Sequence, residues 1–220
     1  MSRGGDETRL AVLDHAFSLA SQVGLGGLTI GRLADDLKIS KSGLFGHFQS
    51  KEALQVQVLR HAADKFVGAV LRPALKAPRG EARVRQLFER WLEWPQVVPQ
   101  PGGCIFVAAA TELDDKPGPA RDVLVELQRD WLEVLANAAR TAVAVGDFHR
   151  SADPEQFAQD LYGIMLACHH ARRLLRDPKA VERSRVAFEG VLGAARAGTS
   201  ARSRPSRRGG RNEPQPGRRA

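Results

Sequence analysis

The sequence predicts an all-α fold of about nine helices. Apolar residues recur at spacings of three and four along most of the chain, and no stretch of four to eight residues alternates between apolar and polar side chains. No Asn-Gly pair marks a tight hairpin. Proline and glycine residues then divide the chain into helical segments.

The first four helices are expected at residues 7–23, 29–37, 41–48 and 51–72. Leu10, Leu13 and Phe17 give the first helix an apolar face, and the glycines that follow residue 23 end it. Ser50 is placed to cap the fourth helix, which the prolines at 73 and 78 close.

The five later helices are bounded by helix-breaking residues. Residues 81–94 stop before Pro95, residues 104–113 form a short apolar helix, and residues 119–145 form a long one. Asp153-Pro154 and Asp177-Pro178 each combine an N-cap with a proline in the first turn. They predict the last two helices at 154–176 and from 178 to about 197.

The composition excludes several classes of protein. The longest apolar run, residues 161–168, has eight residues, which is too short to cross a bilayer. The first nine residues lack the apolar stretch of a secretory signal, and two cysteines are too few for a disulfide framework. We therefore expect a cytoplasmic protein that neither spans nor binds a membrane.

The net charge of +8 is concentrated at the end of the chain. Residues 201–220 hold seven arginines and one glutamate, a balance of +6, which leaves +2 for the other 200 residues. Residues 197–220 contain Gly, Ser, Pro and Arg with almost no large apolar residue, so this segment is predicted to be a disordered Arg-rich tail. It is either an arm that attracts phosphates or a solvated extension without a function.

Residues 28–54 carry the pattern of a helix-turn-helix. Thr29 and Ser40 are both N-cap residues, and each opens a short helix. Only residues 38–40 join the two helices, and each helix has one apolar face. In such a motif the second helix enters the major groove of DNA.

Gly43 and Gly46 lie inside the second of these helices, where each costs about 1 kcal/mol relative to alanine. A helix surface without side chains can approach DNA closely, which is the functional interpretation. The alternative is that the apolar face alone holds the helix and the glycines are merely tolerated.

This segment resembles the DNA-binding domain of the TetR/AcrR family of bacterial transcriptional regulators. The resemblance covers roughly residues 8–55, and the plan of nine helices is also similar to that family. The residues that match the family are Thr29, Ala34, Ile39, Ser40, Lys41, Leu44, Phe45, His47, Phe48 and the run from Ser50 to Leu54. The resemblance implies a DNA-binding domain at 1–54 and a helical ligand-binding and dimerisation domain at 55–196.

The resemblance also implies the DNA contacts. Lys41, Ser42 and Phe45 match positions that face bases, while His47 and Lys51 match positions that hold phosphates. The complete set expected at the DNA is Thr29, Arg32, Lys41, Ser42, Gly43, Phe45, Gly46, His47 and Lys51. Phe45 stands where the family commonly has tyrosine, and Gly46 where a larger side chain is common, so affinity for each half-site is expected to be modest.

The middle helices hold the candidate ligand site. Aromatic side chains with a few polar groups are typical of a small-molecule pocket, although each of them could equally be core. The candidates are Trp91, Phe106, Trp131, Tyr162, Met165 and His169. Cys168, His169 and His170 are consecutive, so on a helix they point in different directions and do not predict a metal site. No catalytic residue, metal or cofactor is expected.

By the resemblance, the last two helices form a homodimer, which would bind an inverted-repeat operator on double-stranded DNA. Small residues on them would permit close approach: Gly163, Ala167, Gly190, Gly193 and Ala194. The predicted function is a repressor that a small molecule of unknown identity releases from DNA. Two alternatives are a helical carrier or enzyme that uses Cys104, Cys168 or His169, and a sequence-indifferent nucleic-acid binder driven by the tail.

Overall fold

The computed structural model describes residues 3–197. Over these residues it confirms the all-α prediction, with nine helical segments and no strand. The segments are α1 (Arg3–Val23), α2 (Ile30–Leu37), α3 (Lys41–Phe48), the continuous run of α4 (Lys51–Phe66), η1 (Val67–Leu71) and α5 (Arg72–Ala74), α6 (Glu81–Val97), α7 (Ile105–Leu113), α8 (Pro119–Ala144), α9 (Pro154–Arg173) and α10 (Ala180–Ala197). The predicted tail, from residue 198 onward, lies outside the described residues.

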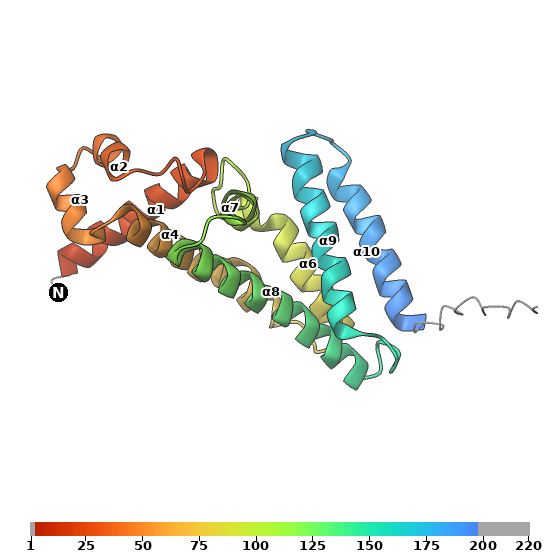
Figure 1. Ribbon diagram of the computed structural model, residues 1–220. Coiled ribbons are helices and arrows are strands. Elements are labelled where there is room, and N and C mark those ends of the chain that lie inside the picture. The colour runs from red at the N-terminus through yellow and green to blue at the C-terminus, as the bar shows by residue number, and fades with distance from the viewer. Residues whose placement is uncertain (1–2, 198–220) are drawn as a thin grey trace, which may run out of the picture.

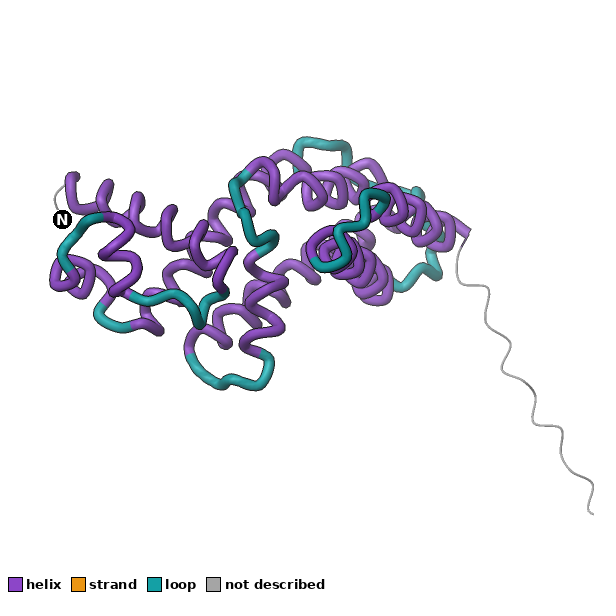
Figure 2. Tube along the Cα trace, turned by 90° about the horizontal axis from the view of Figure 1, so that it is seen from above, coloured by secondary structure: helices purple, strands orange, loops and turns teal. Residues whose placement is uncertain are grey.

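The helices form an elongated molecule with two recognisable ends. Figure 1 shows α1, α2 and α3 at one end and the antiparallel pair α9 and α10 at the other. The long helices α4 and α8 run side by side between them. Figure 2 shows the same helices from above, joined by short loops. None of the described helices is both long and apolar enough to cross a membrane.

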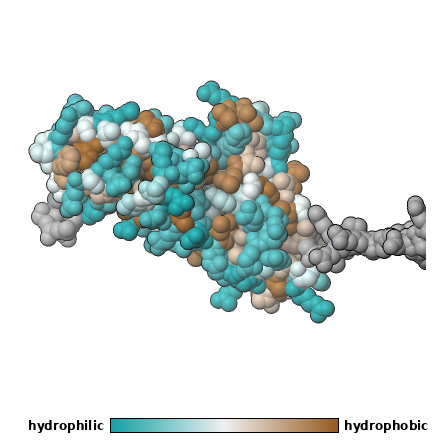
Figure 3. All heavy atoms as spheres, viewed as in Figure 1, coloured by the Kyte–Doolittle hydropathy of each residue, from teal (hydrophilic) through white to brown (hydrophobic). Residues whose placement is uncertain are grey.

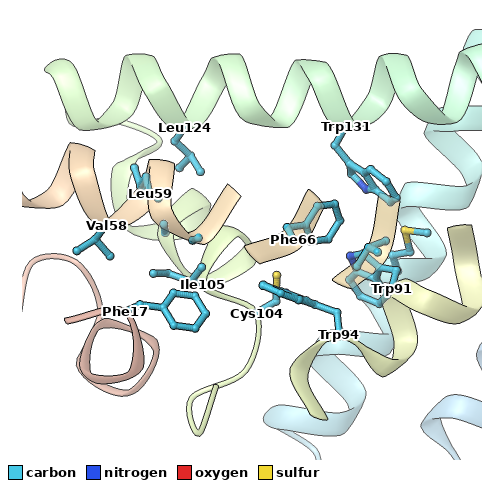
Figure 4. Packing of buried hydrophobic residues seen from close by; sticks show 14 of the residues in the cluster. Phe17, Val58, Leu59, Phe66, Trp91, Trp94, Cys104, Ile105, Leu124 and Trp131 are labelled. Carbon is cyan, nitrogen blue, oxygen red and sulfur yellow. The ribbon is translucent and has the colours of Figure 1, made fainter. Parts of the chain in front are cut away.

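One continuous core joins the two ends. It reaches from Phe17 on α1 to Phe188 on α10, and the ring of Phe17 lies 6.3 Å from the ring of Trp94 on α6. Phe66, at the end of α4, packs edge-on against Trp94 and Trp131, with ring centroids 5.3 and 5.0 Å apart. Figure 4 shows Phe66 between these rings. Each such aromatic pair contributes about 0.5–1.5 kcal/mol beyond the area that it buries.

Helix α10 is held to α6 by both apolar and ionic contacts. The rings of Phe88 and Phe188 lie 4.2 Å apart. Arg185 pairs with Glu89 at 2.7 Å, and Arg196 pairs with Glu81 at 2.5 Å. Exposed ion pairs contribute at most about 1 kcal/mol each, so the aromatic contact dominates the packing of this helix.

Helix α6 does not stop at Pro95, as the sequence predicted, but continues to Val97 with the proline inside it. Proline cannot donate the backbone hydrogen bond to the carbonyl of Trp91, which usually ends a helix. Trp91, Leu92 and Trp94 on this turn are all buried. Their packing offsets the lost hydrogen bond.

Other helix boundaries also differ from the predictions. The fourth helix widens into the π-helical turn η1, where the amide of Arg72 donates to the carbonyl of Val67, and it continues past Pro73 to Ala74. The ninth segment begins at Ala180 rather than 178, because Asp177 and Pro178 form a turn in which the amide of Ala180 donates to the carbonyl of Asp177. Helix α9 accordingly ends at Arg173 instead of 176.

Candidate nucleic-acid interface and ligand cavity

Helices α2 and α3 are set by local capping. The Thr29 hydroxyl accepts a hydrogen bond from the amide of Arg32 at 3.1 Å, and the Ser40 hydroxyl accepts one from the amide of Gly43 at 3.1 Å. Lys38 ends α2 with a φ of 56°, in the left-handed region. The three residues between the helices therefore form the tight joint that the sequence predicted.

The two faces of α3 have opposite roles. Leu44 and Phe48 are each 1% exposed and anchor the helix to the core. The remaining surface of the helix is open to solvent, and the ring of Phe45 is 53% exposed. Within residues 3–197, Phe45 is not one of the apolar side chains that pack against the core. It is therefore available for contact with another molecule.

All nine residues expected at the DNA are exposed in the structure: Thr29, Arg32, Lys41, Ser42, Gly43, Phe45, Gly46, His47 and Lys51. A side chain added at Gly46 would meet no atom within 4 Å, so packing within the protomer does not require glycine there. A side chain at Gly43 would come within 3.1 Å of the Ser40 hydroxyl. Gly43 and Gly46 therefore leave a bare strip on α3, that is, a strip of the helix surface without side chains.

Lys51 has an additional role that the sequence did not reveal. Its Nζ donates to the carbonyl of Gly26 at 2.5 Å, across the turn between α1 and α2. The buried amide of Gln55 donates to the carbonyl of Leu25 in the same turn, at 2.8 Å. The start of α4 is thereby fastened to the turn that precedes the helix-turn-helix.

Glu112, near the end of α7, holds the other side of this turn. Its Oε2 accepts a hydrogen bond from the amide of Leu25 at 2.8 Å, and its Oε1 accepts one from the amide of Gly26. A Cβ atom at residue 24 would lie 2.7 Å from Oε2, and one at residue 26 would lie 2.3 Å from Oε1. Only glycine at these two positions lets the carboxylate approach so closely.

A cavity of about 310 Å³ lies between α4, η1, α6, α7, α8 and α9. Five aromatic side chains dominate its wall, and Figure 4 shows Phe66, Trp91 and Trp131 pointing toward one another. Its lining is Ala63, Phe66, Val67, Leu71, Trp91, Cys104, Phe106, Val107, Leu127, Gln128, Asp130, Trp131, Val134 and Tyr162. A volume and an apolar wall of this kind are typical of a small-molecule site.

Two polar side chains in this wall are hydrogen-bonded to one another. The Tyr162 hydroxyl donates to Oε1 of Gln128 at 2.5 Å, and Nε2 of Gln128 donates to the carbonyl of Phe106 at 3.2 Å. Burial raises the pKa of Tyr162 to about 12, so the phenol remains neutral at physiological pH. These groups present hydrogen-bonding atoms to the cavity without a charge.

The comparisons with known proteins agree with this geometry. Residues 12–58 match the model of the bacterial regulatory proteins of the tetR family, and residues 80–188 match that of the tetracyclin repressor-like C-terminal domain. The chain belongs to the TetR family. It is therefore a DNA-binding transcriptional regulator and not an enzyme, which removes the alternative of catalysis by Cys104, Cys168 or His169.

Solved structures share the fold of this TetR-family chain at low sequence identity. A TetR-family regulator from Cytophaga hutchinsonii aligns with a TM-score of 0.77 at 16% identity, over 89% of this chain and 98% of that one. One from Chloroflexus aurantiacus gives 0.77 at 22% identity, over 88% and 96%. AibR, solved in complex with isovaleryl coenzyme A and operator DNA, gives 0.64 at 20% identity, over 84% and 96%. A search of curated proteins finds no match.

Of the six ligand-site candidates in this TetR-family regulator, Trp91, Phe106, Trp131 and Tyr162 line the main cavity. Met165 is fully buried and does not line it. His169 lines a second, smaller cavity of about 140 Å³. Trp91 and Cys104 belong to both walls.

The second cavity brings together both cysteines and His169. Cys104 and Cys168 are free and buried, and burial raises the pKa of the Cys104 thiol. Within residues 3–197 no three His, Cys, Asp or Glu side chains are grouped so that they could hold a metal ion. Burial, with Arg173 and Arg172 nearby, lowers the pKa of His169 to about 4.

The low pKa of His169 predicts a specific dependence of stability on pH. The unfolded chain takes up a proton at this histidine below about pH 6.5, whereas the folded chain does so only near pH 4. The free energy of unfolding should therefore fall as the pH decreases from 6.5 to 4, with no contribution from this group above 6.5. In His169→Gln the fall should be shallower, measured by urea unfolding at several pH values. Identical slopes for the two proteins would contradict the assignment.

The outward face of α9 and α10 is rich in small side chains. Gly163, Ala167, Gly190, Gly193 and Ala194 are all exposed. Side chains added at the three glycines would meet no atom within 4 Å. At the turn between the two helices, Leu174 and Leu175 are 70% and 63% exposed, and Figure 3 shows an apolar patch there.

Proposed function

We propose that this TetR-family regulator is a repressor that leaves a pseudo-palindromic operator when a small molecule occupies its main cavity. The observation that carries the proposal is that one continuous helical run, from α4 to α5, begins beside α3 and then forms part of the cavity wall. Residues 1–54 form the DNA-binding part and residues 55–196 the ligand-binding and dimerisation part. The protein acts in the cytoplasm.

The exposed surface of α3 is the proposed recognition surface. Lys41, Ser42 and Phe45 contact bases in the major groove, and His47, Thr29 and Arg32 contact phosphates. Lys51 contributes one of its three N–H groups to a phosphate while another holds Gly26. The bare strip at Gly43 and Gly46 lets the helix backbone approach the groove closely.

The main cavity is the proposed effector site. AibR, which has the same fold, was solved with both a small molecule and operator DNA, and this supports a ligand for the present chain as well. Occupation of the cavity displaces Phe66, Val67 or Leu71, which belong to the run that starts at Lys51. The two recognition helices of a dimer have a different spacing in each conformation. A ligand that binds one conformation more tightly shifts the population of dimers toward that conformation.

Two copies associate through the outward faces of α9 and α10. The small residues there permit the close approach that a four-helix interface needs, and the exposed leucines of the turn add apolar area. A symmetric dimer would place two α3 helices on two half-sites, so we expect an operator with inverted repeats.

The experiment is a pair of titrations. Small molecules are first selected by their quenching of the tryptophan fluorescence of the cavity, and operator affinity is then measured by fluorescence anisotropy with and without each. Typical coupling energies of 1–3 kcal/mol predict operator binding about five- to 150-fold weaker with ligand. Molecules that occupy the cavity and leave operator affinity unchanged would contradict the proposal.

The Arg-rich segment provides a test of the remaining alternative, in which the tail drives sequence-indifferent binding. A variant that ends at residue 197 loses seven arginines and one glutamate, so its net charge falls by six. It should keep its preference for the operator over unrelated DNA, while its affinity becomes less sensitive to salt if the tail contacts phosphates. Loss of the sequence preference would favour the alternative, and an unchanged salt dependence would exclude the tail from binding.

A further inference from the structure

We propose that the effector of the main cavity is a largely aromatic molecule without a negative charge. This proposal rests on the proposed function, and it concerns the chemical class of the ligand. The wall contains no lysine, arginine or histidine among its fourteen residues. The one side chain of this wall that is charged at neutral pH, Asp130, is exposed to solvent.

The cavity wall offers no positive counter-charge to an anionic ligand. Four aromatic rings, from Phe66, Trp91, Phe106 and Trp131, can stack on a flat ligand. Two polar groups of the wall, Tyr162 and Gln128, are neutral and hydrogen-bonded to each other. An anionic group brought into this wall would lose its hydration without gaining a cationic partner, which is strongly unfavourable. An anion would in addition be repelled by Asp130.

Two fluorescent probes with the same ring skeleton test the proposal directly. N-phenyl-1-naphthylamine is neutral at pH 7, and 8-anilinonaphthalene-1-sulfonate carries one added sulfonate. The neutral probe should bind the full-length protein at least tenfold more tightly. Equal or tighter binding of the sulfonate, or binding of neither probe, would overturn the proposal.

A substitution in the wall should reverse this preference. Leu127→Lys places a cation in the lining, and it should strengthen sulfonate binding at least tenfold relative to the neutral probe. Val145→Lys adds the same charge just after α8, at an exposed position outside the cavity lining, and should leave the ratio unchanged. If both variants change the ratio equally, the probes bind outside the cavity and the proposal fails.

These titrations contain no DNA, so their result is separate from that of the proposed function. A neutral ligand that binds the cavity but does not release the operator would refute the proposed release and would support the proposed ligand class. An anionic ligand that binds the cavity and releases the operator would refute the ligand class and support the proposed release.

The geometry independently assigns Glu112 a positioning role between the cavity and the recognition surface. Helix α7 contributes Phe106 and Val107 to the cavity wall, and Glu112 lies five residues beyond Val107, a rise of about 7.5 Å along the helix. Its carboxylate holds the amides of Leu25 and Gly26. A shift of α7 is therefore transmitted to the turn that leads into α2.

The contacts around this turn make the connection stiff. Lys51 and Gln55 hold the carbonyls of Gly26 and Leu25, while Glu112 holds the amides of the same two residues. The turn is thus fixed from α4 on one side and from α7 on the other. Both of these elements also reach the cavity, so the turn senses their relative position.

Amide hydrogen exchange, with and without saturating operator DNA, tests the role of Glu112 without the need for an effector. In the wild-type protein, operator binding should slow exchange across residues 105–113 at least threefold, because coupling between two sites is reciprocal. In Glu112→Ala this slowing should disappear, although the variant still binds the operator at higher concentration. Glu126→Ala, at an exposed carboxylate on α8, is the matched control and should behave like the wild type.

The opposite results are equally clear. Slowing of the same size in Glu112→Ala would show that α7 senses DNA by another route. Absence of slowing in the wild-type protein would show that α7 and the recognition surface are uncoupled. Either result overturns the role of Glu112.

Discussion

Replacing Gly46 with glutamate is expected to weaken operator binding at least about 100-fold while the protein remains folded. Residue 46 is exposed on α3, and a side chain there meets no atom of the protomer within 4 Å. The new carboxylate would therefore stand where phosphates and base edges approach, and like charges at an interface cost several kcal/mol. Fluorescence anisotropy with labelled operator measures the affinity, and circular dichroism measures the thermal unfolding.

Two controls separate the charge from its location. Gly68→Glu adds the same charge at another exposed glycine with open space around it, and it should leave operator affinity within about twofold of the wild type. Gly46→Ala should stabilise α3 by up to about 1 kcal/mol, and it should weaken operator binding far less than Gly46→Glu because a methyl group carries no charge. If Gly46→Glu binds as tightly as the wild type, this surface of α3 does not face DNA.

Replacing Gly190 with glutamate is expected to separate the dimer and to weaken operator binding by about two orders of magnitude or more. The residue lies on the outward face of α10, where an added side chain meets nothing within the protomer, so the fold should tolerate the change. In a symmetric dimer the substitution brings two like charges together in the interface. Each protomer would then bind its half-site without the advantage of a linked second site.

Multi-angle light scattering at micromolar concentration distinguishes the two states of this variant. The wild-type protein should have the mass of a dimer and Gly190→Glu that of a monomer. Ala144→Glu, at an exposed position on α8, adds the same charge away from this face and should remain dimeric. A dimeric Gly190→Glu would place the interface elsewhere.

The sequence predicted a helix boundary correctly where interactions between residues close in the sequence determine it, and less well where distant residues do. Helices α2 and α3 begin where Thr29 and Ser40 predicted, because a cap bonds to an amide only three residues away. The continuation of α6 through Pro95 could not be predicted, since it depends on the burial of Trp91 and Trp94 by other helices. The same applies to the π-helical turn before Pro73.

The candidate sites show the same division. The exposure of the expected DNA contacts follows from the apolar face of α3, which Leu44 and Phe48 define locally. For the ligand-site candidates, the sequence could not tell which helix face would border a cavity, so they include Met165, which lies in the core. Glu112 was missed because its partners are 86 and 87 residues away. The glycines at 24 and 26, which permit its approach, were the available signal.

The central claim is that this protein recognises specific DNA as a symmetric dimer. Sequencing of genomic fragments retained by the purified full-length protein at near-physiological salt tests it most directly. The structure predicts enrichment of one or a few short inverted repeats whose half-sites match the two α3 helices of a dimer. Retention that is independent of sequence and disappears as salt increases would contradict the claim.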